Sequence, residues 1–102
     1  MIEINQVYQK SADMVYREIV GEGVLVPIRR SVGDFESIFT LNETAARIWS
    51  LVDGQRSLAE ICQALTREFE IETAEAETDI LELASQLKQI GAIHLAGLTT
   101  VA

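Results

Sequence analysis

The side chains best suited to nucleophilic or metal chemistry in this sequence are a lone cysteine and a lone histidine, Cys62 and His94. A thiolate beside an imidazole can act as a nucleophile, and such a pair joined by carboxylates can bind a metal ion. Cys62 falls on the apolar stripe of a predicted helix, where a buried thiol is a small inert hydrophobe. His94 is predicted at the surface or at a strand end, and the pair lacks the dense spacing of zinc motifs. We therefore predict no catalytic residue, no metal site and no cofactor.

Other routes to chemistry are equally poor. The Gly-Glu-Gly run at 21–23 is too short for a phosphate-binding loop and precedes a strand rather than a helix. The many carboxylates are typical of solvated helix faces, and 102 residues leave little room for the cleft that an acid pair requires. Trp49 is a candidate binding anchor, but its helical spacing with Ala45, Ile48 and Val52 favours core packing. The chain is thus predicted to be a binding module, not an enzyme.

The elements that would position such a binding site begin with three short strands. Val, Ile and Tyr recur between turn residues in the first forty positions, which predicts strands over 14–20, 24–28 and 35–41 with turns at 21–23 and 31–34. Their short connections favour an antiparallel meander. In the third strand Phe39 and Leu41 are predicted to face the core, with Ile38 and Thr40 on the other side. Pro27 is expected at an edge, an end or a bulge, because it cannot donate to a ladder.

After the third strand the apolar spacing becomes helical. Three helices are predicted, capped by Asn42, by Ser57 in a capping box with Glu60, and by Thr73. The first is expected to end at 53–54 and the third at Gly91, with a short strand over 92–95. The sequence predicts one domain over 1–102, with a core of about 14–95 and flexible ends. Its predicted class is α+β and winged-helix-like, a three-stranded antiparallel sheet followed by three helices.

Charge limits the partners. The net charge is -8, and residues 68–82 hold seven acidic side chains and no Lys or Arg. In a winged-helix fold the third helix enters DNA, and such an acidic helix would be repelled by phosphates. We therefore predict no nucleic acid and no membrane partner, and keep a DNA-binding regulator only as an alternative. Basic peptides are the natural guests.

The remaining surface suggests a peptide groove. The edge of the third strand offers free backbone groups that can accept an extended peptide. Ile38 is available beside it, unless the N-terminal segment covers that side chain. Leu81, Ser85 and Lys88 share a face of the third helix that could wall a groove, unless Leu81 packs under a loop. The same edge could also pair with a second copy, so a homodimer is an alternative.

The sequence resembles the PqqD-like family, also called RiPP recognition elements. The run Leu41-Asn42-x-x-Ala45-x-x-Ile48-Trp49, followed by Asp53-Gly54, carries the resemblance, which extends over about 14–95. It implies a non-catalytic chaperone that binds the leader of a ribosomally made precursor peptide. It also implies delivery of that precursor to a radical-SAM enzyme, as in pyrroloquinoline quinone biosynthesis. A structural subunit docked on a larger enzyme is a second alternative.

The resemblance also implies where the leader binds, as a strand beside the third strand and against the third helix. Carried onto this chain, the site comprises Ser37, Ile38, Phe39, Thr40, Leu41, Leu81, Ala84, Ser85 and Lys88. The family often has a larger apolar residue where this chain has Ala84, so the groove is expected to be wider or differently filled. The segment that precedes the first helix in the namesake protein is also missing, which favours the broad family and leaves the pathway open.

The expected compartment is the cytoplasm. A single cysteine cannot form an internal disulfide, which fits a reducing setting. The first ten residues lack the basic start and apolar run of a signal peptide, and no apolar stretch approaches the roughly 20 residues that span a bilayer.

Overall fold

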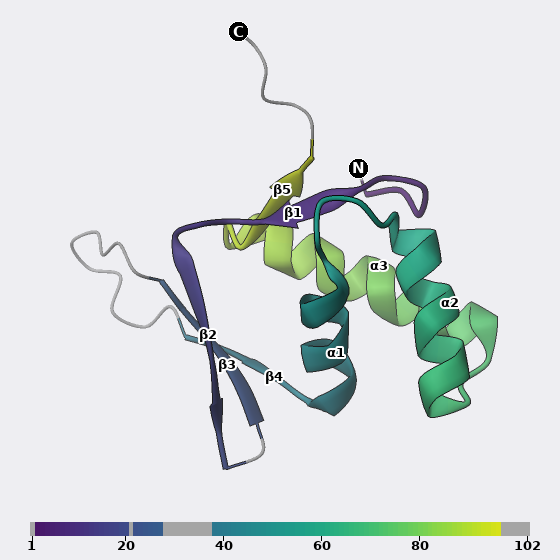
Figure 1. Ribbon diagram of the computed structural model, residues 1–102, viewed down its shortest axis with the longest axis horizontal. Helices are drawn as coiled ribbons and strands as arrows, with labels where there is room; N and C mark the ends of the chain where they lie inside the picture. The colour runs from purple at the N-terminus through teal and green to yellow at the C-terminus, as the bar shows by residue number, and fades with distance from the viewer. Residues whose placement is uncertain (1, 21, 28–37, 97–102) are drawn as a thin grey trace, which may run out of the picture.

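A computed structural model of the chain describes residues 2–20, 22–27 and 38–96. The elements are β1 (Tyr8–Lys10), β2 (Met14–Ile19), β3 (Glu22–Pro27), β4 (Phe39–Leu41), α1 (Glu43–Leu51), α2 (Leu58–Phe69), α3 (Thr73–Gln89) and β5 (Ile93–Leu95) (Figure 1). The predicted α+β class is confirmed, because an antiparallel sheet in the order β2-β3-β4 precedes three helices. The predicted turn at 31–34 lies outside the described residues.

The meander turns one residue earlier than predicted. Ile19 ends β2 and pairs with Glu22, so Glu22 and Gly23 belong to β3 rather than to the turn. Gly23 serves a different purpose: a Cβ at this position would lie 2.8 Å from Cε1 of Tyr16, so the glycine makes room for the ring. Pro27 ends β3, as expected of a residue without an N–H.

A second, two-stranded sheet was predicted only in part. The expected final strand is present as β5, but its partner β1 was missed. β1 and β5 are antiparallel, and flanking backbone bonds from Ser11 N to Ala92 O (2.8 Å) and from Ala96 N to Val7 O (2.9 Å) extend the pairing. Tyr8 in β1 is only 1% exposed. The packed core therefore begins before residue 14.

The helix boundaries follow from capping. The Asn42 side chain accepts a bond from Ala45 N at 2.8 Å, and Ser57 and Glu60 form the reciprocal capping box of α2, so both predictions are confirmed. The predicted Thr73 cap is wrong by one residue. Ala76 N donates to Glu72 O at 2.9 Å, which makes Glu72 the cap and Thr73 the first helical residue.

Two helix ends were also predicted. The first helix stops at Leu51, slightly before the expected 53–54, because Val52 N folds back onto Trp49 O at 3.2 Å. The third ends where expected: Gly91 has φ of +80°, a left-handed conformation that glycine adopts without a steric penalty.

The core joins the helices to the helix-facing side of the meander. Leu25 and Leu41 from the sheet are fully buried in one cluster with side chains of all three helices. Trp49 and Cys62 belong to this cluster, which confirms their predicted packing roles. Burial is the main cause that raises the pKa of the Cys62 thiol.

The hairpin of β2 and β3 projects away from the helices, while β4 returns toward them and leads into α1 (Figure 1). Within the three-stranded sheet, both β3 and β4 contact α1. Among the described helices, none is long and apolar enough to cross a membrane.

Candidate functional site

The outer edge of β4 is fixed by the register of the meander. Ile19 and Glu22 flank a two-residue connection, so they form a hydrogen-bonded pair, and such pairs alternate along an antiparallel ladder. The backbone groups of Gly23 and Leu25 consequently point to β4, where their partners are Leu41 and Phe39.

Thr40 lies between these two partners and has the opposite orientation. Its N–H and C=O point away from β3, toward the open side of the sheet. In the described part of the chain, β4 pairs with no strand other than β3. One complete donor–acceptor pair therefore faces outward at the centre of β4.

The side chains of β4 alternate as predicted. Leu41 is buried and Phe39 is half-buried against the core, while Thr40 is exposed. Ile38, directly before the strand, is 58% exposed, so the N-terminal segment does not cover it. Ser37 lies outside the described residues.

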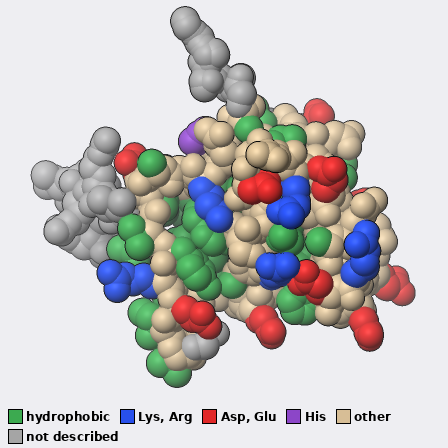
Figure 2. Space-filling view, in the orientation of Figure 1, with side chains coloured by type: hydrophobic (Ala, Val, Ile, Leu, Met, Phe, Trp, Pro, Cys, Tyr) green, Lys and Arg blue, Asp and Glu red, His purple; other side chains and the backbone are tan. Residues whose placement is uncertain are grey.

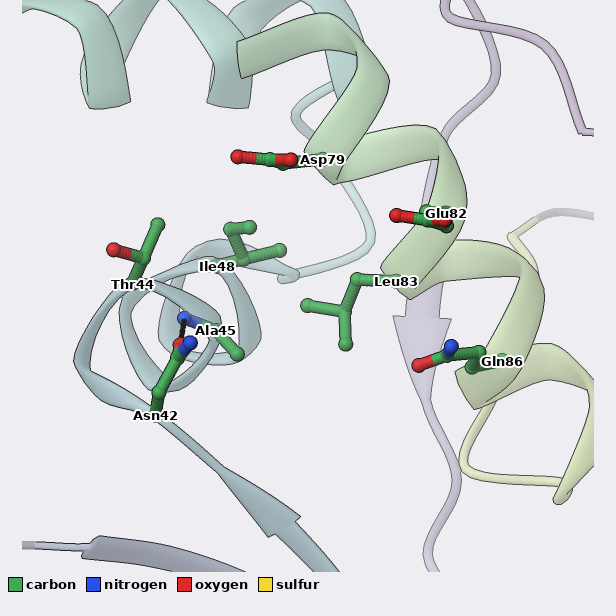
Figure 3. Close-up of a pocket in the computed structure, with 8 residues that line it drawn as sticks. All are labelled: Asn42, Thr44, Ala45, Ile48, Asp79, Glu82, Leu83 and Gln86. Atoms are coloured by element: carbon green, nitrogen blue, oxygen red, sulfur yellow. Dashed lines mark hydrogen bonds between the residues drawn. The ribbon is translucent and has the colours of Figure 1, made fainter. Parts of the chain in front are cut away.

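A pocket opens immediately after β4, between the start of α1 and the middle of α3. Its cavity of about 220 Å³ is lined by Asn42, Thr44, Ala45, Ile48, Asp79, Glu82, Leu83 and Gln86. Figure 3 shows the four α3 side chains pointing toward α1, with Leu83 directed between Ala45 and Ile48. Since Asn42 follows Leu41 in the chain, the pocket is continuous with the end of β4.

The pocket combines a small apolar floor with a more extensive polar wall that includes acidic side chains. Ala45, Ile48 and Leu83 supply the apolar surface, and Asp79 and Glu82 are exposed carboxylates on the α3 wall. No Lys, Arg or His lines it. The Asn42 amide oxygen is already engaged as the α1 cap.

None of the α3 residues that the sequence analysis assigned to the binding site lines this pocket. Ala84 is 2% exposed and belongs to the core, and Leu81 is half-buried against it. Leu81 and Ser85 each lie two residues from Leu83, which places them about 160° around the helix from it. Ser85 and Lys88 are exposed on that other face.

The α3 lining residues were missed by sequence reasoning for a specific reason. A helical stripe identifies Leu83 as a core residue but does not say which flank of the stripe faces α1. The signal that could have found the others is spacing: Asp79 and Gln86 lie four residues before and three residues after Leu83, on the same face.

The side chains of His94 and Lys10 make contacts away from this pocket. His94 is exposed on β5, as predicted, and its ring lies 2.7 Å from the Gln9 amide nitrogen. The ammonium of Lys10 lies 5.2 Å from the centre of the Trp49 ring, a cation–π contact. In residues 2–20, 22–27 and 38–96, no three His, Cys, Asp or Glu side chains gather to hold a metal ion.

Comparison with known proteins places the chain in a family. The sequence profile of the family described as coenzyme PQQ synthesis protein D (PqqD) matches residues 22–93. A protein of Xanthomonas campestris pv. campestris (strain B100), named PqqA binding protein, is 41% identical over 54 residues, which span 53% of this chain and 59% of that protein. A protein of the same name from Xanthomonas axonopodis pv. citri (strain 306) is 39% identical over 54 residues, again 53% of this chain and 59% of that protein. The chain thus aligns with little more than half the length of these relatives.

Two solved structures share the fold over most of its length. "TbiB1 in Complex with the TbiA(beta) Leader Peptide" superposes with a TM-score of 0.68 at 24% identity, covering 90% of this chain and 99% of that one. "Lasso peptide synthetase B1 complexed with the leader peptide" gives 0.70 at 29% identity, covering 85% and 96%. Because the family profile extends over most of the sequence, from the start of β3 to the start of β5, the chain belongs to the PqqD family.

Proposed function

We propose that this chain is a non-catalytic peptide chaperone that binds the leader of a ribosomally made precursor peptide on the open edge of β4. The observation that carries the proposal is the outward N–H and C=O of Thr40, next to a pocket between α1 and α3. Membership of the PqqD family supports it, as do relatives named for binding PqqA and a structural neighbour complexed with a leader peptide.

The leader binds as an added strand. Backbone pairing with Thr40 supplies affinity independent of sequence, and alternate side chains supply specificity. Guest side chains on the same face as Phe39 and Leu41 point toward the helices. Asn42 lies two residues beyond Thr40, about 7 Å along an extended strand, so a guest only a few residues long reaches the pocket.

The proposed contact surface modifies the sequence-based one. The strand part is kept as Ser37–Leu41, and on α3 the contacts are Leu83 and Gln86 in place of Leu81, Ala84, Ser85 and Lys88. The exposed carboxylates of α3 that line the pocket favour a peptide over DNA, because a phosphate backbone would be repelled there.

The delivery step involves a second protein. The chaperone passes its bound precursor to a peptide-modifying enzyme, proposed to be a radical-SAM protein in the cytoplasm. A second copy of the chain could occupy the same strand edge, and a guest leader would then compete with the homodimer for it.

The test uses a matched pair of variants at Thr40. Thr40→Pro removes the outward N–H but no bond to β3, and proline is tolerated on an edge strand with its nitrogen facing out. Thr40→Val keeps the N–H. With a synthetic precursor leader peptide as titrant, we expect Thr40→Pro to raise Kd at least about tenfold and Thr40→Val to change it little.

The binding comparison is valid only if both Thr40 variants are folded. Thermal unfolding of both variants shows that the domain persists, and only then are the Kd values compared. Equal binding by Thr40→Pro and the unmodified chain would reject strand addition on β4. Binding of a DNA duplex with steep salt dependence would instead support the regulator alternative.

A further inference from the structure

The pocket between α1 and α3 is the size of a side chain rather than of a small molecule. Its volume of about 220 Å³ is below the roughly 300–1,000 Å³ of typical sites for drug-sized ligands. It lies at the end of β4, where a guest strand would run. An occupant supplied by that strand therefore fits its position and its dimensions.

The two carboxylates of the pocket are unneutralised in the described chain. Asp79 and Glu82 form no ion pair or hydrogen bond through their side chains with any described residue. The basic residue of α1, Arg47, is held by Glu68 of α2, with Nε–Oε1 at 2.8 Å and Nη2–Oε2 at 2.9 Å.

Lys88, the basic residue of α3, also points away from the pocket. Lys88 lies five residues after Leu83, about 140° around the helix from it, and does not line the pocket. The pocket thus presents an apolar floor and two carboxylates without any basic side chain of its own. The group that complements such a surface has an apolar stem and a positive head.

We infer that this pocket receives a Lys or Arg side chain of the guest peptide, with Asp79 and Glu82 as specificity-determining residues. The inference rests on the proposed function and names the chemistry of its guest. The stem of the basic side chain packs on Ala45, Ile48 and Leu83, and its head forms charge-assisted hydrogen bonds with the carboxylates. Because both carboxylates are exposed, the gain weakens as salt screens it.

The probe is a displayed library of randomised twelve-residue peptides, selected on the intact chain. Parallel selections use Asp79→Asn/Glu82→Gln and a control, Glu75→Gln/Glu77→Gln, which removes the same charge from exposed positions of α3 outside the pocket. Selected peptides are then resynthesised with the basic residue or with norleucine, and each Kd is measured at low and high salt.

We expect peptides from the unmodified chain and the control to share a Lys or Arg at a fixed position. The pocket variant should lose that preference and bind the basic peptide about tenfold more weakly at low salt, yet bind the norleucine peptide as well as the unmodified chain does. Selected peptides that bind but show no basic position would overturn the inference and leave the proposed function standing. Failure to select any peptide sensitive to Thr40→Pro would overturn both.

Discussion

Val20 is a β-branched residue in a conformation that β-branched residues rarely adopt. Its φ is +51°, in the left-handed region, and its side chain is 96% exposed at the tip of the β2–β3 hairpin. Figure 2 shows hydrophobic side chains gathered at this tip, where Ile19 is also 54% exposed. A side chain this exposed gains little packing against the described residues to offset the backbone strain, so the strain lowers the stability of the hairpin.

Replacing Val20 should therefore stabilise the protein. Val20→Asn supplies a residue that tolerates the left-handed region and is favoured in two-residue hairpin connections. We expect the free energy of unfolding to rise by about 1 kcal/mol, measured by urea denaturation. Val20→Thr is the control, because it makes the tip more polar but keeps the β-branch. An equal gain from both variants would show that backbone conformation is not the cause.

At the scale of the element, Asp53 organises the connection between α1 and α2. Its Oδ1 accepts hydrogen bonds from the backbone N–H groups of Gln55 and Arg56, both at 2.9 Å, and its Oδ2 lies 2.9 Å from the Arg56 guanidinium. The backbone bonds, from Arg56 first and then Gln55, are the main causes that lower the pKa of the Asp53 carboxyl. The ionised form is therefore favoured in the folded chain.

This lowered pKa predicts how the free energy of unfolding changes with pH. A carboxyl whose folded pKa lies below its unfolded value of about 4 contributes stability above that value and loses it as pH falls through the folded pKa. Asp53→Asn keeps an acceptor oxygen but cannot titrate, so its stability should fall less steeply as the pH drops below about 5. Urea denaturation across that range measures the slope, with Glu18→Gln on β2 as the matched neutralisation. An unchanged slope in Asp53→Asn would contradict the account.

The elements most open to prediction were those fixed by local hydrogen bonds. Asn42, the Ser57–Glu60 box and Gly91 mark helix ends because their side chains or φ act within a few residues. β1 was missed because Tyr-Gln-Lys has no alternation, and its pairing comes from β5, more than eighty residues later. The predicted α3 residues differ from the pocket-lining ones for a similar reason: spacing defines a stripe, but only tertiary packing shows that Leu83 lies beside Asn42, at the end of β4.

At the scale of the whole molecule, the N-terminal arm ties the two ends of the described chain to the helices. β1 pairs with β5, Val7 bridges to Ser57, and backbone carbonyls of Ile4 and Gln6 accept bonds from Ala59 and Leu58 at 2.7 and 3.0 Å. These carbonyls satisfy N–H groups at the start of α2. The ring of Tyr8 anchors the arm in the core, and its hydroxyl donates to Gln6 Oε1 at 3.0 Å.

Two substitutions at Tyr8 separate the ring from the hydroxyl. Tyr8→Phe keeps the buried ring and should cost about 1 kcal/mol of unfolding free energy, as is typical for one lost hydrogen bond. Tyr8→Ala leaves a cavity and should cost about 3 kcal/mol or more. Both values come from urea denaturation. Similar small losses for the two variants would mean that the arm is not part of the cooperative core.

In the described chain, the meander, the arm and the helices together leave the outer edge of β4 open beside the pocket between α1 and α3. The hairpin extends away from the helices, and the arm covers β5 and the start of α2, so neither blocks the outward side of β4 in the described chain (Figure 1). The central claim is that a guest peptide pairs with the backbone of Thr40 on this side.

Residue-resolved amide hydrogen exchange tests that claim most directly. In the free chain, we expect the N–H of Thr40 to exchange quickly and those of Phe39 and Leu41 to be protected by β3. A saturating leader peptide should slow exchange at Thr40 strongly while changing its two neighbours little. Unchanged exchange at Thr40 under saturating peptide would contradict the account.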